Sequence, residues 1–362
     1  MAALKAPATA NGRPSLLDMC DAGGCGSKLS LAELEPIVAQ LVASRSDLHR
    51  PHILDDFGDA AVQLCPHTDT CLITTLDFGT PVSEDPFTWG YIAAQNAMSD
   101  VYAVGGTPST ALSILGWPSG GIAGLDIHEI FAGALAAVTA ASVSIVGGHS
   151  LISAIPFFGL SVTGFARKAD VRGNGSGKAG MTLCLTKKIG SGFAIAGRKA
   201  RILRDEAWAE AEALMKASNA PASQAAQRAG IRAGTDVTGF GVLGHAHMLA
   251  RRSGVAVELW PEAVPTIAAV REGLAAGTVA SSAERLMLEA EEFSAFAALP
   301  PDLRLVLCDP QTSGGLMLAG TEDQMGKLGP ELQRGSNLWG IGRLLDGAAG
   351  AVTFGKPGAR VP

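Results

Sequence analysis

Apolar residues recur at helical spacing in several stretches of the chain. The run S-L-A-E at residues 30–33 is a capping box, and apolar positions 31, 34, 37, 38, 41 and 42 follow it, which predicts a helix over residues 31–43. A helix is also predicted over 87–104, because Gly105 and Gly106 follow it and Pro108 stands just beyond. Further helices are predicted at 126–140, 192–203, 205–217, 222–232, 240–252, 266–275 and 322–328. Strands are predicted at 61–65, 71–76, 111–115, 143–146, 157–166, 182–186, 255–259, 304–307, 316–319, 337–343 and 350–354.

A glycine-rich polar segment at residues 168–180 divides this pattern into two halves, each of which mixes strands and helices. A chain of 362 residues is long enough for roughly two domains. The predicted fold class is therefore α/β (α+β), with two mixed-sheet domains. We expect a disordered leader at 1–15, an N-terminal domain at 16–167, a connector at 168–180 and a C-terminal α/β domain at 181–362.

Composition and charge exclude several classes of protein. Charged residues make up 17% of the chain and hydrophobic residues 47%, which excludes disorder over most of its length. The 28 basic and 34 acidic residues give a net charge of −6 without a Lys/Arg-rich run, so no nucleic-acid partner is expected. The six cysteines form no C-x-x-C pair, and no disulfide framework is needed.

Two segments bear on where the protein resides. Residues 1–15 contain no apolar core long enough for a signal peptide. Residues 130–148 carry no charged side chain, but small residues dominate the window and its pattern breaks at 141–142. We therefore expect a buried helix followed by a buried strand instead of a membrane span, and a cytoplasmic protein without a membrane partner.

Three motifs suggest chemistry that their context does not support. The G-x-G-x-x-G pattern at 175–180 precedes a strand instead of a helix. The same pattern at 239–244 opens a helix, but a helix is predicted at 222–232, so the preceding strand that a dinucleotide fold requires is missing. His245 and His247 stand two residues apart on a helix and diverge, so a core or surface role is expected instead of metal binding.

Four aspartates stand beside small or apolar neighbours: Asp59, Asp77, Asp100 and Asp236. Asp77 follows a predicted strand, and Asp100 shares a helix face with Asn96. A carboxylate in an apolar setting is costly unless it meets a cation, and Mg²⁺ binds through a few carboxylates together with substrate phosphates. Any one of these residues alone is more simply a turn or cap residue, whereas the four together favour a metal site.

Two polar loops are candidates for phosphate binding. Residues 147–150 (G-G-H-S) follow a predicted strand, where glycines would let the backbone approach a phosphate and Ser150 would add a hydrogen bond. The alternative is an ordinary turn. Residues 309–315 (D-P-Q-T-S-G-G) form either a cradle or a rigid turn.

The segment G-G-C-G-S-K at residues 23–28 is the most unusual in the chain. A thiol flanked by glycines is exposed, and the nearby Lys28 lowers the pKa of the Cys25 thiol and favours the thiolate. Lys28 could equally hold a phosphate as a point charge. Cys20 is close enough to act as a resolving thiol. The alternative is an incidental loop cysteine.

Together the motifs of this chain resemble those of the selenophosphate synthetase (selenide, water dikinase) family, within the aminoimidazole-ribonucleotide-synthetase-like superfamily. The resemblance runs in order over about residues 16–355. It rests on G-C-G-S-K (24–28), G-D-A-A-V (58–62), T-T-L-D-F (74–78), N-A-M-S-D (96–100), I-L-G-W-P (114–118), G-G-H-S (147–150), T-D-V-T-G-F-G-V-L-G-H (235–245) and L-C-D-P-Q-T-S-G-G-L (307–316).

The resemblance implies a reaction in which ATP, hydrogen selenide and water yield selenophosphate, AMP and phosphate. It implies two mixed-sheet domains, a flexible N-terminal loop over the ATP cleft, Mg²⁺ as cofactor, K⁺ as activator, a homodimer and a selenium-delivery partner. Cys25 and Lys28 match the catalytic positions. Asp59, Asp100 and Asp236 match metal ligands. The matching nucleotide-contacting positions are Lys28, Asp56, Phe57, Gly58, Asp77, Asp100, Gly148, His149 and Ser150.

The chain departs from the family pattern at two places. Ser27 stands where the family often has a second cysteine, and Phe57 and Gly58 stand where polar residues are common, so contacts there would come from the main chain. The alternatives are another ATP-dependent kinase of the superfamily, such as a thiamine-monophosphate-kinase-like or hydrogenase-maturation-like enzyme, and a non-catalytic nucleotide-binding regulator. The Cys-Gly-x-Lys loop argues against both.

Overall fold

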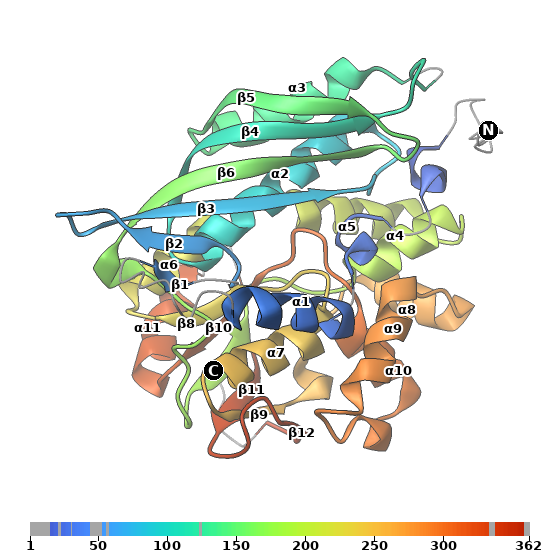
Figure 1. The fold of residues 1–362 in the computed structure, drawn as a ribbon. Helices are drawn as coiled ribbons and strands as arrows, with labels where there is room; N and C mark the ends of the chain where they lie inside the picture. The colour runs from blue at the N-terminus through green and yellow to red at the C-terminus, as the bar shows by residue number, and fades with distance from the viewer. Residues whose placement is uncertain are drawn as a thin grey trace.

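The computed structural model of this chain describes residues 15–20, 23–29, 31–43, 53–55, 58–122, 125–332 and 337–357 (Figure 1). Residues 1–14 of the predicted leader lie outside this part, and so do Asp56 and Phe57. The backbone of Cys25 is described but its side chain is not. Among the described residues, no helix has the length and apolar character that crossing a membrane requires.

The N-terminal half is built on a six-stranded sheet with two long helices on one face (Figure 1). Its strands run in the order β1 (Ile53–Asp55), β2 (Ala61–Leu64), β3 (Thr70–Gly79), β6 (Phe157–Arg167), β4 (Thr107–Trp117) and β5 (Ser144–Ile152). All neighbours pair antiparallel except β4 and β5. Alternate residues of β3 from Cys71 to Asp77 are buried, because successive side chains of a strand point to opposite faces.

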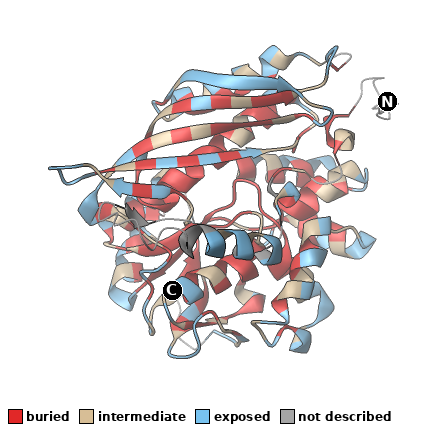
Figure 2. Cartoon of the chain, viewed as in Figure 1, coloured by how far each residue is buried: buried red, intermediate tan, exposed pale blue. Residues whose placement is uncertain are grey.

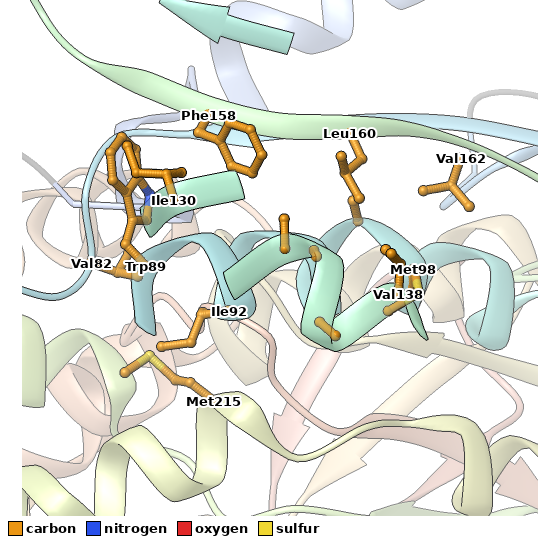
Figure 3. Close-up of a cluster of buried hydrophobic side chains, with 14 of the residues drawn as sticks. Val82, Trp89, Ile92, Met98, Ile130, Val138, Phe158, Leu160, Val162 and Met215 are labelled. Atoms are coloured by element: carbon orange, nitrogen blue, oxygen red, sulfur yellow. The ribbon is translucent and has the colours of Figure 1, made fainter. Parts of the chain in front are cut away.

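The helices α2 (Pro86–Ala103) and α3 (Ile127–Ala140) pack tightly under this sheet. A Cβ atom on Gly90 would lie 1.9 Å from the carbonyl oxygen of Ile130, so glycine permits this close approach. Figure 3 shows Phe158, Leu160 and Val162 of β6 above the helices, and Met215 of α5 reaching the same cluster from below. The helix α2 is therefore buried between the sheet and the second half of the chain, together with its polar side chains.

The C-terminal half is built on a second six-stranded sheet with helices packed around it. Its strand order is β12 (Val352–Phe354), β9 (Ala256–Leu259), β11 (Trp339–Leu345), β7 (Thr182–Leu185), β10 (Leu316–Gly320) and β8 (Ala233–Asp236). Its helices are α4 (Ser191–Lys199), α5 (Asp205–Lys216), α6 (Ala220–Arg228), α7 (Gly241–Arg252), α8 (Ala268–Ala276), α9 (Ser281–Ala290), α10 (Pro301–Cys308) and α11 (Glu322–Leu332). The helix α1 (Leu31–Ala43) lies in front of this half in Figure 1. These two sheets with their helices confirm the predicted fold class.

Several sequence predictions about local structure were wrong. Residues 304–307, predicted as a strand, lie in α10, which begins at Pro301, the helix position where proline is tolerated. The strand β8 was missed because its sequence A-G-T-D contains a single β-branched residue, and glycine and aspartate are rare in strands. A strand therefore does precede the glycines at 239–244, but β8 pairs antiparallel with β10 in the described sheet instead of forming a parallel β-α-β unit, so the dinucleotide fold remains excluded.

Residues 147–150 were also placed wrongly, because they were expected to form a loop after a strand that ends at 146. The strand β5 continues to Ile152, so these residues lie within an edge strand. Glycine usually weakens a strand, which is why the pair Gly147-Gly148 suggested that the strand ends there.

A buried arginine of the connector ties the two halves together. Nη1 of Arg172 donates to the carbonyl oxygens of Tyr102 (3.1 Å) and Ala103 (3.0 Å), and Nη2 donates to that of Ser223 (3.2 Å). Burial lowers the pKa of Arg172 to about 10, so the guanidinium remains charged at neutral pH. Its charge also suits the carbonyl end of α2.

Replacing Arg172 by alanine is expected to lower the free energy of unfolding by about 3 kcal/mol or more, because three buried carbonyl groups lose a charged donor. Urea unfolding followed by circular dichroism measures the change. The control is Arg343→Ala, which removes a half-exposed ion pair with Glu258 and is expected to cost less than about 1 kcal/mol. Equal losses in the two variants would contradict this role of Arg172.

Candidate active site

Three of the predicted aspartates converge where the two halves of the chain meet. Asp77 lies on the inner face of β3, Asp100 lies near the end of α2, and Asp236 is the last residue of β8. All three carboxyl groups are at least nine-tenths buried. The packing of α2 against both β3 and β8 brings these residues, which are far apart in the sequence, to one place.

Each carboxylate at this place is held by neighbouring polar side chains. Oδ2 of Asp77 lies 3.0 Å from Nζ of Lys28 and accepts a hydrogen bond of 2.6 Å from Nδ2 of Asn96. Oδ2 of Asp100 accepts a bond of 2.5 Å from the hydroxyl of Thr75. Lys28 therefore lies beside the carboxylate of Asp77.

The other two acidic residues are bonded by hydroxyl groups as well. The Ser99 hydroxyl donates to Oδ2 of Asp236 at 2.6 Å. Asp59, just before β2, accepts a bond of 2.7 Å from the Thr235 hydroxyl of the C-terminal half. Thr235 directly precedes Asp236, so this bond holds Asp59 close to Asp236.

The electrostatics of the cluster favour a bound cation. Burial and then the negative charges of Asp236 and Asp77 raise the pKa of Asp100 well above its ordinary value, against the influence of Lys28 and the Thr75 hydroxyl. Burial also raises the pKa of Asp236, although the Ser99 bond opposes this. Several buried carboxylates beside one lysine leave an excess of negative charge that a divalent cation would neutralise.

The carboxylates present therefore suit a divalent metal ion, but they do not surround it as a complete set of protein ligands. Among the described residues, no three His, Cys, Asp or Glu side chains stand in metal-ligating positions. A hard cation that keeps several waters and binds phosphate oxygens does not need such a cage. The donor set of carboxylate oxygens suits magnesium-like ions better than soft metals.

The turn that carries Cys25 is docked against both halves of the chain. Cys25–Ser27 forms a short 3₁₀ helix, and the Gly24 N–H donates to the carbonyl oxygen of Thr80 at 3.2 Å. Gly24 has a φ of +55°, and a Cβ atom there would lie 2.5 Å from Oγ1 of Thr312, so only glycine fits. The Ser27 hydroxyl donates to the carbonyl oxygen of Gly24 at 2.6 Å, which gives Ser27 a structural role in closing the turn.

Gly148, His149 and Ser150 do not lie beside the aspartates in this chain. Gly148 pairs with Ser113 on β4, whereas Asp77 lies on β3, which β6 and β4 separate from β5. Three strand spacings correspond to about 14 Å. Their part in nucleotide binding stays a prediction, as does that of Gly58, which lies in a bend before β2.

The loop at residues 309–315 was expected to be either a phosphate cradle or a rigid turn. Its side chains hydrogen-bond to the start of α4, as a rigid turn would. Oε1 of Gln311 accepts hydrogen bonds from the backbone N–H groups of Gly190 and Ser191. Oδ2 of Asp309 accepts from the Gly192 N–H. Burial raises the pKa of Asp309 to about 8. These side chains cap the start of α4, so they are engaged within the protein.

The two histidines of α7 have core roles, as predicted. Nε2 of His245 accepts a hydrogen bond from the Thr238 N–H at 3.0 Å, and burial lowers the pKa of His245 to about 3. The ring of His247 stacks on Phe293 at a centroid distance of 3.9 Å and pairs with the carbonyl oxygen of Gly350. The two rings therefore serve separate contacts.

Comparison with known proteins places the chain among ATP-using relatives. Residues 57–166 match the family described as AIR synthase related protein, N-terminal domain, and residues 178–352 match its C-terminal domain. The chain is 39% identical over 302 residues to a selenide, water dikinase of Cronobacter sakazakii, covering 82% of this chain and 84% of that protein. It is 36% identical over 342 residues to that of Rhizobium meliloti, covering 93% of this chain and 97% of that protein.

Solved structures share the fold at lower sequence identity. Thiamine monophosphate kinase from Aquifex aeolicus superposes with a TM-score of 0.63 at 18% identity, covering 91% of this chain and 99% of that protein. The hydrogenase maturation protein HypE in complex with ATP superposes with a TM-score of 0.57 at 17% identity, covering 88% and 90%. These likenesses concern the arrangement of strands and helices.

Proposed function

Because the chain belongs to the selenide, water dikinase family, we propose that it converts ATP, hydrogen selenide and water to selenophosphate, AMP and phosphate. The observation that carries this proposal is the meeting of Lys28 with the buried Asp77, Asp100 and Asp236 beside the Cys25 turn. A cation and several carboxylates are the groups that phosphoryl transfer from ATP requires.

Mg²⁺ is the proposed cofactor, held by Asp59, Asp100 and Asp236. When bound it would neutralise charge on the triphosphate oxygens. Asp77 and Asp100, with Lys28, would position the nucleotide, and so would Asp56, Phe57 and Gly58 through the backbone before β2. K⁺ is the proposed activator.

Lys28 and Cys25 have separate proposed tasks. The ammonium group of Lys28 would offset the negative charge that develops on the transferred phosphoryl group. Cys25 would hold hydrogen selenide at the site by hydrogen bonding, without a sulfur–selenium bond, on its turn, which closes over the reacting atoms and keeps water out of the first transfer. The selenium nucleophile attacks the γ-phosphorus and releases ADP. Water then attacks the β-phosphorus of ADP, which yields AMP and phosphate.

The test is product analysis with ATP, Mg²⁺ and K⁺, with and without selenide under anaerobic conditions. We expect AMP and a selenium-bound phosphorus signal that both depend on selenide, and we expect both to be lost in Cys25→Ser. ADP as the end product would instead assign the chain to a kinase-like relative. Nucleotide binding without turnover would instead indicate a non-catalytic nucleotide-binding regulator.

We also propose that the outer face of the N-terminal sheet forms a homodimer contact. This face turns away from α2 and α3, and Figure 2 shows the edge strand β5 exposed along its length. It carries exposed apolar side chains on four strands: Leu76, Phe78, Leu112, Leu151 and Phe165. A contiguous apolar patch of this kind is typical of a protein interface. A partner that delivers selenium would then approach from another side of the molecule, near the Cys25 turn.

Replacing Leu112 by lysine, at the centre of this face, is expected to convert a dimer to a monomer, because a charge would be buried in an apolar contact. Light scattering coupled to size-exclusion chromatography measures the mass. The control is Leu288→Lys on α9, where the leucine is 79% exposed. A wild-type monomer, or a Leu112→Lys dimer of unchanged strength, would overturn the proposed contact.

A further inference from the structure

A buried lysine joins two segments of the C-terminal half that face α2. Nζ of Lys187 donates to the carbonyl oxygen of Ala217 at 2.6 Å and to that of Ser313 at 2.8 Å. Lys187 is 8% exposed. Ser313 has a φ of +50°, a conformation that a residue with a side chain rarely adopts without support. The ammonium group supplies such support, since it holds the carbonyl group of this strained residue.

The strained residue in turn orients an amide of the N-terminal half. The Ser313 N–H donates to Oδ1 of Asn96 at 2.7 Å, and Nδ2 of Asn96 donates to Oδ2 of Asp77 at 2.6 Å. Because the amide oxygen is engaged by an N–H, the amide nitrogen must be the atom that faces Asp77. A backbone group of the C-terminal half thus fixes a donor to a carboxylate of the N-terminal sheet.

A second chain of hydrogen bonds reaches the other carboxylate. Nδ2 of Asn219 donates to the carbonyl oxygen of Gly314 and to the Ser99 hydroxyl, both at 2.8 Å. The Ser99 hydroxyl donates to Oδ2 of Asp236 at 2.6 Å. A hydroxyl group has one proton, so the bond received from Asn219 leaves that proton for Asp236. Asn219 is 3% exposed.

From these contacts we infer that Asn219 is a positioning residue for the metal site, and that Lys187 is a positioning residue for Asp77, the carboxylate proposed to position the nucleotide. They act through Ser99, and through Ser313 and Asn96, to set the orientation of the carboxylates of Asp236 and Asp77. Both chains cross between the halves, so the carboxylates take this orientation only when the loop at 309–315 and α2 are packed together. The inference rests on the proposed function for the identity of the ligand, but its contacts belong to this chain alone. Groups that orient metal ligands commonly change metal affinity by about 10- to 100-fold when removed.

The test measures metal binding directly, with Mn²⁺ as a spectroscopic probe and a non-hydrolysable ATP analogue. Electron paramagnetic resonance titration counts free Mn²⁺ and needs no turnover. We expect Asn219→Ala to weaken Mn²⁺ binding by about 10-fold. Ser99→Ala should do the same, and the double variant should be no weaker than either single one, because the two residues act in one chain. Lys187→Met acts through Asp77, so it should weaken binding of the ATP analogue together with the Mn²⁺ that the analogue carries.

The matched control is Asn174→Ala, which removes another buried asparagine, 2% exposed, that lies in the connector and, among the described residues, has no hydrogen bond to either chain. Thermal unfolding of every variant shows that it is folded. Unchanged Mn²⁺ affinity in Asn219→Ala, additive effects of Asn219→Ala and Ser99→Ala, or an equal loss in Asn174→Ala would overturn the inference. Normal Mn²⁺ binding in a wild-type protein that makes no selenophosphate would instead refute the proposed function and leave the positioning role intact.

Discussion

Lys28→Met should form selenophosphate at least about 10³-fold more slowly than the wild type, through a lower kcat. The ammonium group lies 3.0 Å from Asp77 at the edge of the buried carboxylates, where a fixed positive charge acts in a medium of low dielectric constant. Cations aimed at a transferred phosphoryl group contribute about 10³- to 10⁵-fold in related chemistry. Single-turnover measurements with saturating ATP separate this loss from a loss of nucleotide binding.

The matched control for Lys28→Met is Lys188→Met. Lys188 pairs with Glu210 at 3.0 Å on the partly exposed surface of the C-terminal half, and its replacement should change kcat less than about twofold. If Lys28→Met retained most of the wild-type kcat, Lys28 would serve only to hold the turn against Asp77. A variant that lost ATP binding but kept its kcat would assign Lys28 to nucleotide binding instead of to the transfer step.

The sequence predicted those parts of the site that strong local patterns specify. Asp100 lies on a helix whose end is marked by two glycines, so it could be placed on its element. Asp77 was expected just after a strand, but it lies within β3, which continues to Gly79. The aspartates together favoured a metal site, but nothing in their spacing said that Lys28 would lie beside Asp77. Spacing along the chain does not report how α2 packs between two sheets.

The positioning residues could not have been found in this way. Asn219 and Lys187 donate to carbonyl groups of residues far away in the sequence, and Ser313 reaches Asn96 through its own backbone N–H. A carbonyl or N–H group is present at nearly every position, whatever the side chain. The loop at 309–315 likewise reads as a cradle or a turn until its partners at the start of α4 are known. A sequence motif marks such a loop as unusual but does not say which of its atoms face inward.

The strand errors have a similar physical origin. The A-G-T-D strand β8 is fully buried, and its burial comes from tertiary packing instead of local propensity. The G-G-H-S residues continue β5 because β4 beside them is long enough to pair through Trp117. In both cases pairing with a neighbouring strand determines whether the segment is a strand. The local sequence pattern carries no information about that neighbour.

Asp100→Asn should reduce metal-dependent activity by about 10²- to 10³-fold, and it should also stabilise the metal-free protein. Burial and the charges of Asp236 and Asp77 raise the pKa of Asp100, so the folded state disfavours its ionised form. Stability from this group therefore falls as the pH rises above the ordinary carboxyl pKa, because the unfolded state ionises first. Asparagine keeps an oxygen that can accept the Thr75 hydroxyl bond and carries no charge.

The expected result is a Tm about 1–3 °C above the wild type at pH 8 in the presence of a chelator, equivalent to about 1–2 kcal/mol, with a smaller difference at pH 5. Saturating Mg²⁺ and ATP should reverse the order, because the wild type gains binding energy that the variant lacks. Asp346→Asn, on an exposed turn after β11, is the control and should leave Tm and activity unchanged. A lower Tm for Asp100→Asn at pH 8 without metal would mean that the Asp100 carboxylate is stabilised by its own hydrogen bonds. The acidic cluster would then stabilise the metal-free fold. It would not be a binding site whose buried charges lower the stability of the protein until a ligand binds.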